Sequence, residues 1–89
     1  GDFDMTKQIQ TSKNLKLSAK VAEYIAKNPD SVKDFKGDLS FVVFSATDNL
    51  LNKVNNNLAN KLKKEGKKVI KVEETKDKTS PWKFIPLSV

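Results

Sequence analysis

The stretch from Leu39 to Glu73 most constrains the fold, because it reads as a strand, a helix and a second strand in succession. The apolar run LSFVVFS comes first, and leucines at helical spacing follow it. After a glycine that can end a helix, the segment KKVIKVE has strand character. A strand that returns through a helix to a second strand forms a parallel pair with a right-handed crossover. The sequence therefore predicts an α/β fold.

A helix and a short helical turn are predicted ahead of this unit. Thr11 or Ser12 can cap a helix that runs to about Lys27. The residue before Pro29 avoids the helical region, which ends that helix. A short helical turn then leads to Gly37, which is suited to a left-handed conformation at its end.

The two ends of the chain are predicted to differ. Residues 1–11 are expected to be a disordered lead-in, in which residues 1–4 precede Met5, a residue that reads as a natural start. The last segment, PWKFIPLSV, is apolar and must be covered, while its two prolines confine any strand to a sheet edge. Residues 12–89 are thus predicted to form a small single α/β domain with an N-terminal helix, a short helical turn, a parallel β-α-β unit and a C-terminal edge segment.

The two predicted strands differ in their apolar pattern. Residues 39–44 are apolar at almost every position, which is typical of a strand covered on both faces. Residues 68–73 alternate between apolar and charged side chains, which predicts a less buried strand.

The composition excludes several kinds of chemistry. The chain has no cysteine and no histidine. A disulfide is therefore impossible, a structural zinc site is not expected, and neither a Ser-His nor a Cys-His nucleophile pair can form. No convincing pair of carboxylates suggests acid–base catalysis, so we expect neither catalytic residues nor a cofactor. The lack of a long apolar run predicts no membrane span and a cytoplasmic location.

The net charge of +6 comes from lysine alone, since arginine is absent. Eight asparagines accompany the seventeen lysines, which favours a compositional origin of the charge. The alternative is a nucleic-acid surface, in which lysines contact phosphates and a tryptophan stacks on a base. Its candidate residues are Lys61, Lys63, Lys64, Lys67, Lys68, Lys71 and Trp82.

The loop after the first strand is the position at which α/β sheets usually bind ligands. Its candidate ligand-binding residues are Ser45, Thr47, Asp48 and Asn49. The loop contains no glycine, and the charge of Asp48 would repel an anion, so capping of the following helix is the favoured interpretation.

The apolar residues of the first helix form two neighbouring stripes, more than one core face requires. One stripe contains Leu15, Ala19, Ala22 and Ile25 or Ala26, and the other contains Leu17, Val21 and Tyr24. One stripe is expected to meet the sheet and the other to meet the C-terminal segment or a second copy of the chain. A non-enzymatic interaction module that acts as a homodimer is therefore the favoured function, and a protein partner is the alternative to self-association. The predicted interface residues are Leu17, Val21, Tyr24, Trp82 and Phe84.

Two blocks of sequence share a pattern with known proteins. The first is NLKLS at residues 14–18, and the second is DNLLNKVNNNLANKLKKEGKKVIKV at residues 48–72, preceded by the apolar strand FVVF. In this pattern the chain resembles a family of small bacterial and archaeal proteins of unknown function. The resemblance implies the strand–helix–strand arrangement and no particular activity. The chain differs from the pattern at Asn28, where a histidine is common, and at Asp48, where an acidic pair is common.

Overall fold

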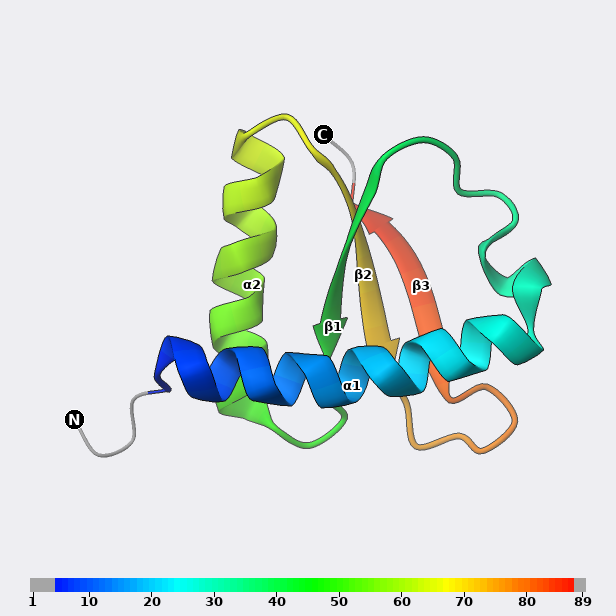
Figure 1. Ribbon diagram of the computed structural model, residues 1–89, viewed down its shortest axis with the longest axis horizontal. Helices are drawn as coiled ribbons and strands as arrows, with labels where there is room; N and C mark the ends of the chain where they lie inside the picture. Colours follow the sequence, from blue (N-terminus) through cyan, green and yellow to red (C-terminus); the bar gives the residue numbers. More distant parts are fainter. Residues whose placement is uncertain (1–4, 88–89) are drawn as a thin grey trace.

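The computed structural model describes residues 5–87, which form helices on both sides of a small sheet (Figure 1). The elements are α1 (Lys7–Lys27), the 3-10 turn η1 (Pro29–Val32), β1 (Leu39–Phe44), α2 (Asn49–Lys64), β2 (Lys68–Glu74) and β3 (Trp82–Leu87). The predicted fold class is confirmed: β1 and β2 are parallel and joined through α2, and β3 is an antiparallel edge strand.

Helix α1 begins earlier than the sequence predicted. Thr6 is its N-cap, and the Thr6 hydroxyl accepts a hydrogen bond from the Ile9 N–H at 3.1 Å. Residues 7–11, predicted as lead-in, are therefore helical, because the cap satisfies a backbone donor at the new helix start. The predicted end of α1 is confirmed, and residues 1–4 lie outside the described residues.

The strand order is β1-β2-β3, so β2 is the central strand. The prediction that β2 is the less buried strand is wrong, because Val69, Ile70 and Val72 are each at most 3% exposed. The charged residues between them do not mark an exposed strand. Lys71, for example, lies on the face that α2 covers, with its Nζ 4.6 Å from the centre of the Phe44 ring.

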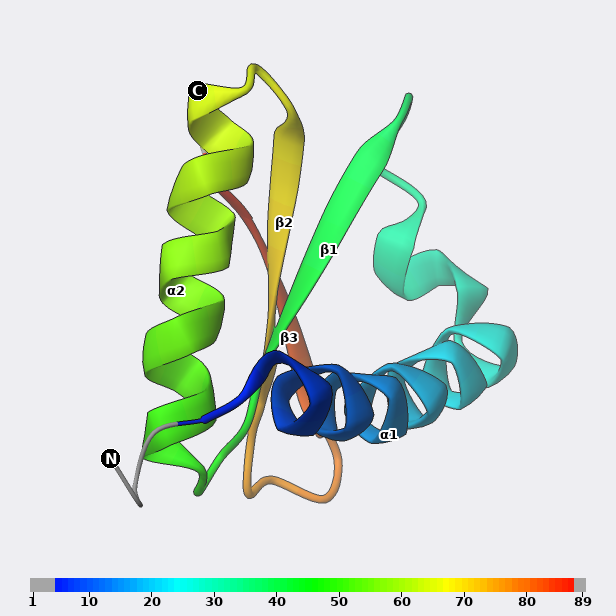
Figure 2. The same ribbon diagram turned by 60° about the vertical axis from the view of Figure 1, so that its left-hand side comes forward.

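The sheet lies between α2 on one face and α1 with η1 on the other (Figure 2). The core on the α1 side contains Val21, Val43, Ile70, Val72 and Trp82. The core on the α2 side contains Val42, Phe44, Ala59 and Val69. Within residues 5–87, neither helix is long and apolar enough to cross a membrane.

Strand β1 is only partly covered on the α1 side. Helix α1 crosses the sheet near the C-terminal end of β1, where it covers Val43 (Figure 1). Phe41, nearer the middle of β1 and on the same face, is 42% exposed. The prediction that residues 39–44 are covered on both faces is therefore wrong for Phe41, because a single helix that crosses the strands covers only one end of them.

Candidate functional site

Side chains of α2 bind the outer edge of β1 at its C-terminal end. The Asn52 carboxamide accepts from the Ser45 N–H at 2.7 Å and donates to the Ser45 carbonyl at 2.8 Å. The Asn55 carboxamide donates to the Val43 carbonyl at 2.8 Å. These two asparagines therefore make hydrogen bonds that a neighbouring strand would otherwise make.

The N-terminal half of the same edge is open. Backbone N–H and C=O groups of successive residues point alternately to the two sides of a strand. The backbone groups of Leu39 and Phe41 therefore point to the outer edge, as those of Val43 and Ser45 do. Within residues 5–87, no hydrogen bond from a side chain or a loop reaches the backbone of Phe41 or Leu39. The outer edge of β1 is thus capped in one half and free to accept a partner in the other.

The Asn55 side chain is the centre of a buried polar network. It has no solvent exposure, and its carbonyl oxygen accepts from Asn14 and from Gln10, each at 3.0 Å. Its amide group also donates to the Asn14 carbonyl oxygen at 2.8 Å. Through these bonds Asn55 connects α1, α2 and β1, and it leaves no part of its hydrogen-bonding capacity unused.

Sequence reasoning missed Asn55. Two of its neighbouring asparagines on α2, Asn56 and Asn60, are exposed, so the residue type alone does not distinguish Asn55. The missed signal was the position of Asn55 four residues after Leu51 and four before Ala59, both of which are buried. A polar residue in the buried stripe of a helix needs partners, and that requirement identifies it.

An apolar patch adjoins the open half of the β1 edge. A hollow of about 190 Å³ is lined by Ser18, Val21, Ala22, Ile25, Phe41 and Val43. Leu15, one turn before Ser18 on the same side of α1, is 66% exposed. We call Phe41 with Leu15, Ser18, Ala22 and Ile25 the β1-edge patch. The expectation that one stripe of α1 meets the sheet is confirmed for the stripe with Leu17 and Val21. In the other stripe Ile25 also packs against the core, while Leu15, Ala19 and Ala22 remain at the surface.

The predicted interface residues lie in the core of the single chain. Val21 and Trp82 are 6% and 8% exposed. Leu17, Tyr24 and Phe84 pack against the same core, and the rings of Tyr24 and Phe84 are 6.4 Å apart between centres. These residues have a structural role in the monomer, and the β1-edge patch lies beside them.

The loop from Ser45 to Asn49 uses its backbone donors within the chain. The Ala46 N–H donates to the Glu74 carboxylate at 2.9 Å. The N–H groups of Thr47 and Asp48 both donate to the Ser45 hydroxyl at 3.1 Å. A phosphate-binding loop would leave such donors free for the ligand. Helix capping by Asp48, the favoured interpretation, is confirmed by its bond from the Leu51 N–H at 3.0 Å.

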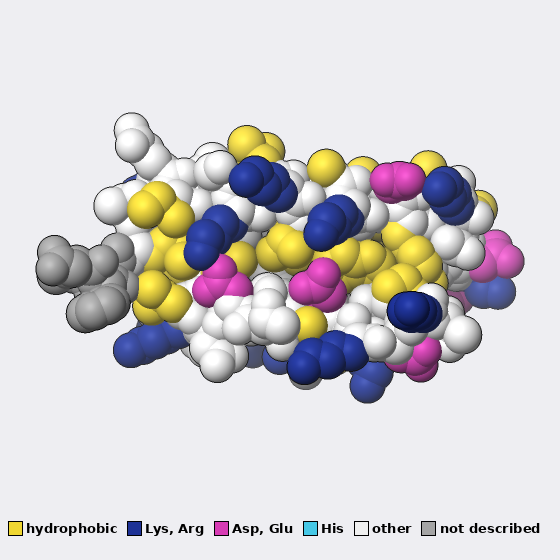
Figure 3. Space-filling view, turned by 90° about the horizontal axis from the view of Figure 1, so that it is seen from below, with side chains coloured by type: hydrophobic (Ala, Val, Ile, Leu, Met, Phe, Trp, Pro, Cys, Tyr) yellow, Lys and Arg dark blue, Asp and Glu magenta, His cyan; other side chains and the backbone are white. Residues whose placement is uncertain are grey.

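Lysines of α1 border this loop. A hollow of about 270 Å³ is lined by Lys13, Lys16, Leu17, Lys20, Ser45, Thr47, Asp48 and Leu51. Lys13 Nζ donates to an Asp48 carboxylate oxygen at 2.6 Å. This bond, with the bond from Leu51, holds the pKa of Asp48 below its usual range. Seen from below, lysines flank an apolar band along which carboxylates lie (Figure 3).

The lysines predicted to contact nucleic acid do not all share one surface. Five of them surround the turn from α2 to β2: Lys61, Lys63, Lys64, Lys67 and Lys68. Lys71 lies beside Phe44 on the α2 face of the sheet, and Trp82 is buried on the opposite face. The structure therefore brings five of the candidate lysines together and separates them from the proposed stacking residue.

Neither a metal site nor a matching family was found for this arrangement of the described residues. Within the described residues, no three Asp or Glu side chains are arranged to hold a metal ion. No family model, curated protein or solved structure matches the chain. The resemblance to a family of small proteins of unknown function therefore remains a hypothesis that rests on the sequence pattern.

Proposed function

We propose that the protein is a non-enzymatic interaction module that works as a homodimer, with the β1-edge patch as its contact surface. The observation that supports this most directly is the 42% exposure of Phe41, a large aromatic side chain beside an open strand edge. An exposed apolar patch next to unpaired backbone groups is typical of an interaction site.

The size of the chain supports the same proposal. A domain of 89 residues buries a modest share of its surface, so its stability is low unless something adds to the core. Without cysteine or histidine, neither a disulfide nor a zinc site can add to it. Association of two copies would cover Phe41 and the exposed stripe of α1 and would supply that additional burial.

The experiment is sedimentation equilibrium of the wild-type chain and of two lysine variants. The wild type is expected to sediment at about twice its mass of 10.0 kDa. Phe41→Lys should sediment as a single chain, because it places a charge at the centre of the contact. Its free energy of unfolding as a monomer should change by less than about 1 kcal/mol, since the replaced side chain is partly exposed.

The matched control is Ile9→Lys. Ile9 is 45% exposed, close to the exposure of Phe41. By helical spacing it shares the side of α1 with Lys13 and Lys16, away from the hollow beside Phe41. This variant should keep the mass of the wild type. A wild-type chain that stays at the single-chain mass across roughly a hundredfold concentration range would refute the proposal.

A second candidate function is the binding of a small anion by the lysines of α1. It is favoured by the three lysines that line the hollow beside Ser45, of which one is paired with Asp48. Inorganic phosphate should then raise the melting temperature, and Lys16→Gln with Lys20→Gln should remove that rise. No change in the wild type would refute this candidate. Nucleic-acid binding by the lysines around the α2–β2 turn stays a prediction, which no further contact supports.

A further inference from the structure

We infer that two copies pair their β1 strands antiparallel about a two-fold axis at Phe41, so that both sheets become one continuous sheet. The inference rests on the proposed self-association and specifies how it occurs. Its occupant is a second copy of this chain, which presents the same open edge.

The open half of β1 is self-complementary in its backbone groups. It offers the N–H and C=O groups of Leu39 and Phe41 and the N–H of Val43, whose carbonyl already binds Asn55. When Phe41 lies opposite Phe41 of the second copy, the two residues exchange both of their N–H···O bonds. In the same register Val43 lies opposite Leu39 of the second copy, but the Val43 carbonyl keeps its bond to Asn55, so the exchange of backbone bonds is centred on Phe41.

The outer edge of β3 is not suited to such pairing. The Thr75 N–H donates to the Pro81 carbonyl at 2.8 Å. Because backbone groups alternate along a strand, those of Pro81 and of every second residue after it point toward β2. The backbone groups of Trp82, Phe84 and Pro86 therefore point away from β2 toward the outer edge, and Pro86 has no N–H to donate. Residues 39–44, in contrast, contain neither a charge nor a proline, the two usual means of protecting an edge.

The register places matching side chains together. A two-fold axis perpendicular to the sheet keeps the α1 helices of both copies on the same side of it. The two Phe41 rings then face each other as a cross-strand aromatic pair, on the side where Leu15 and Ala22 of α1 remain exposed. This arrangement covers Phe41, the strand residue of the β1-edge patch.

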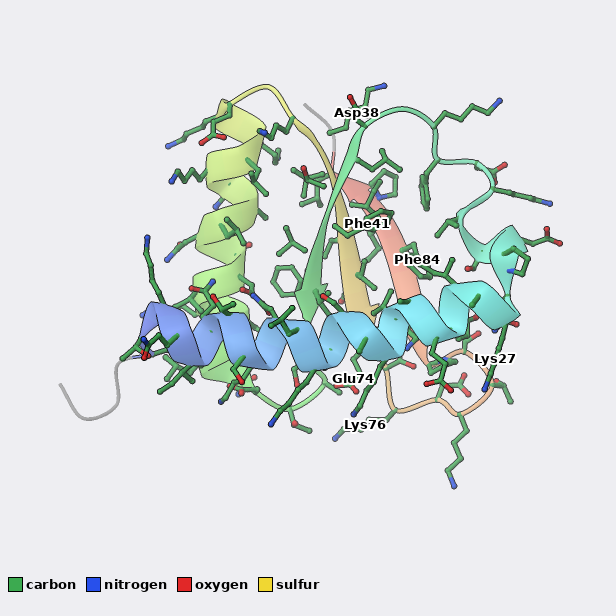
Figure 4. All side chains as sticks on the ribbon, in the orientation of Figure 1. Lys27, Asp38, Phe41, Glu74, Lys76 and Phe84 are labelled. Carbon is green, nitrogen blue, oxygen red and sulfur yellow. The ribbon has the colours of Figure 1, made fainter. Side chains whose placement is uncertain are left out.

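The charges at the two ends of β1 do not select a direction. Asp38 lies at the N-terminal end of β1, far from α1 (Figure 4). Lys67 and Lys68 line the same hollow as Asp38. Lys16 and Lys20 lie at the other end of β1, where Asp48 lines the same hollow. The antiparallel direction therefore follows from the exchange of backbone bonds at Phe41.

The test uses single cysteines, since the chain has none of its own. In a hydrogen-bonded antiparallel pair the two Cα atoms are about 5.5 Å apart, a separation that a disulfide can span. Phe41→Cys should therefore form a covalent dimer on mild oxidation. Asp38→Cys is the register control, because the two cysteines would be displaced by six positions, about 20 Å, and should not join.

A second measurement needs no substitution. The Phe41 N–H points outward, so its hydrogen exchange should slow only as the protein concentration rises. The Val42 N–H faces β2 and should be protected at every concentration. Concentration-dependent protection of Phe41, with cross-linking of Phe41→Cys alone, supports the inference.

The outcomes separate the two proposals. A wild-type chain at the single-chain mass overturns both the self-association and this pairing. A wild-type dimer in which the Phe41 amide stays unprotected, or in which Asp38→Cys cross-links as fast as Phe41→Cys, overturns the strand pairing alone. In that case the two copies meet through another surface.

Discussion

The two outer edges of the sheet are protected in different ways. On β3 the protection lies in the strand itself, where Pro86 removes a donor and Lys83 adds a charge. On β1 it comes from another element, because Asn52 and Asn55 of α2 bind the backbone of Ser45 and Val43. The first kind of protection comes from residues of the strand itself, whereas the second reaches only the backbone groups that the two asparagines bind.

This difference shows that the edge of a strand cannot be judged from the strand alone. The sequence LSFVVF contains no protective residue, yet half of its edge is occupied in the folded chain. The half whose backbone no α2 side chain binds is the half that carries Phe41. Substitutions that remove the protection of one edge at a time separate the contributions of the two edges to stability and association.

Asn55→Ala should have the largest effect, because it removes part of the protection of β1 and the centre of the buried network. The Val43 carbonyl and the Asn14 side chain would each lose a partner in a site closed to water. We expect the free energy of unfolding to fall by about 2–3 kcal/mol, measured by urea denaturation. The control Asn56→Ala changes an exposed neighbour on the same helix and should cost less than about 0.5 kcal/mol. Equal losses in the two variants would contradict the role given to Asn55.

Substitution of Asp48 should have an intermediate effect, since Asp48 caps the helix that carries both asparagines. Asp48→Ala removes the cap and the partner of Lys13, and we expect a loss of about 1 kcal/mol near neutral pH. Asp48→Asn keeps a capping oxygen and should lose less. The comparison is made by urea denaturation of both variants.

The pH dependence of Asp48 has a definite sign. The folded chain lowers the pKa of Asp48, so its contribution is present above the unfolded pKa and is lost as pH falls through the folded one. The wild type should therefore lose stability relative to Asp48→Asn below about pH 4. A constant difference between the two proteins from neutral pH to pH 2 would show that the ion pair contributes nothing.

Pro86→Val should have the smallest effect on stability, within about 0.5 kcal/mol, because Pro86 is exposed at the outer edge. It supplies the missing N–H and should allow the β3 edge to pair, so that species larger than a dimer appear in sedimentation velocity. Pro81→Ala serves as the control, since Pro81 faces β2 rather than the outer edge. An unchanged size distribution for Pro86→Val would mean that Lys83 is sufficient protection.

The helices and strands were predictable from the sequence, and their arrangement relative to one another was not. Periodicity and the caps at Asp48 and Gly66 define the β1-α2-β2 unit in sequence, and Gly66 has the positive φ of 81° expected after a helix. The central place of β2 depends on where residues 82–87 return, which no local pattern contains. The exposure of Phe41 likewise depends on the crossing position of α1. Of the candidate site, the sequence indicated the loop and its cap, and it did not indicate Asn55 or the open edge.

The dependence of Asn55 on α1 also links aggregation to a local motion. Gln10 and Asn14 hold the Asn55 carboxamide in place from α1, which is otherwise a surface helix. When α1 detaches, Asn55 loses the two partners that fix its orientation, and the apolar face of β1 that α1 covers becomes exposed. We therefore expect the rate of aggregation to follow the free energy of local opening of α1 rather than that of global unfolding.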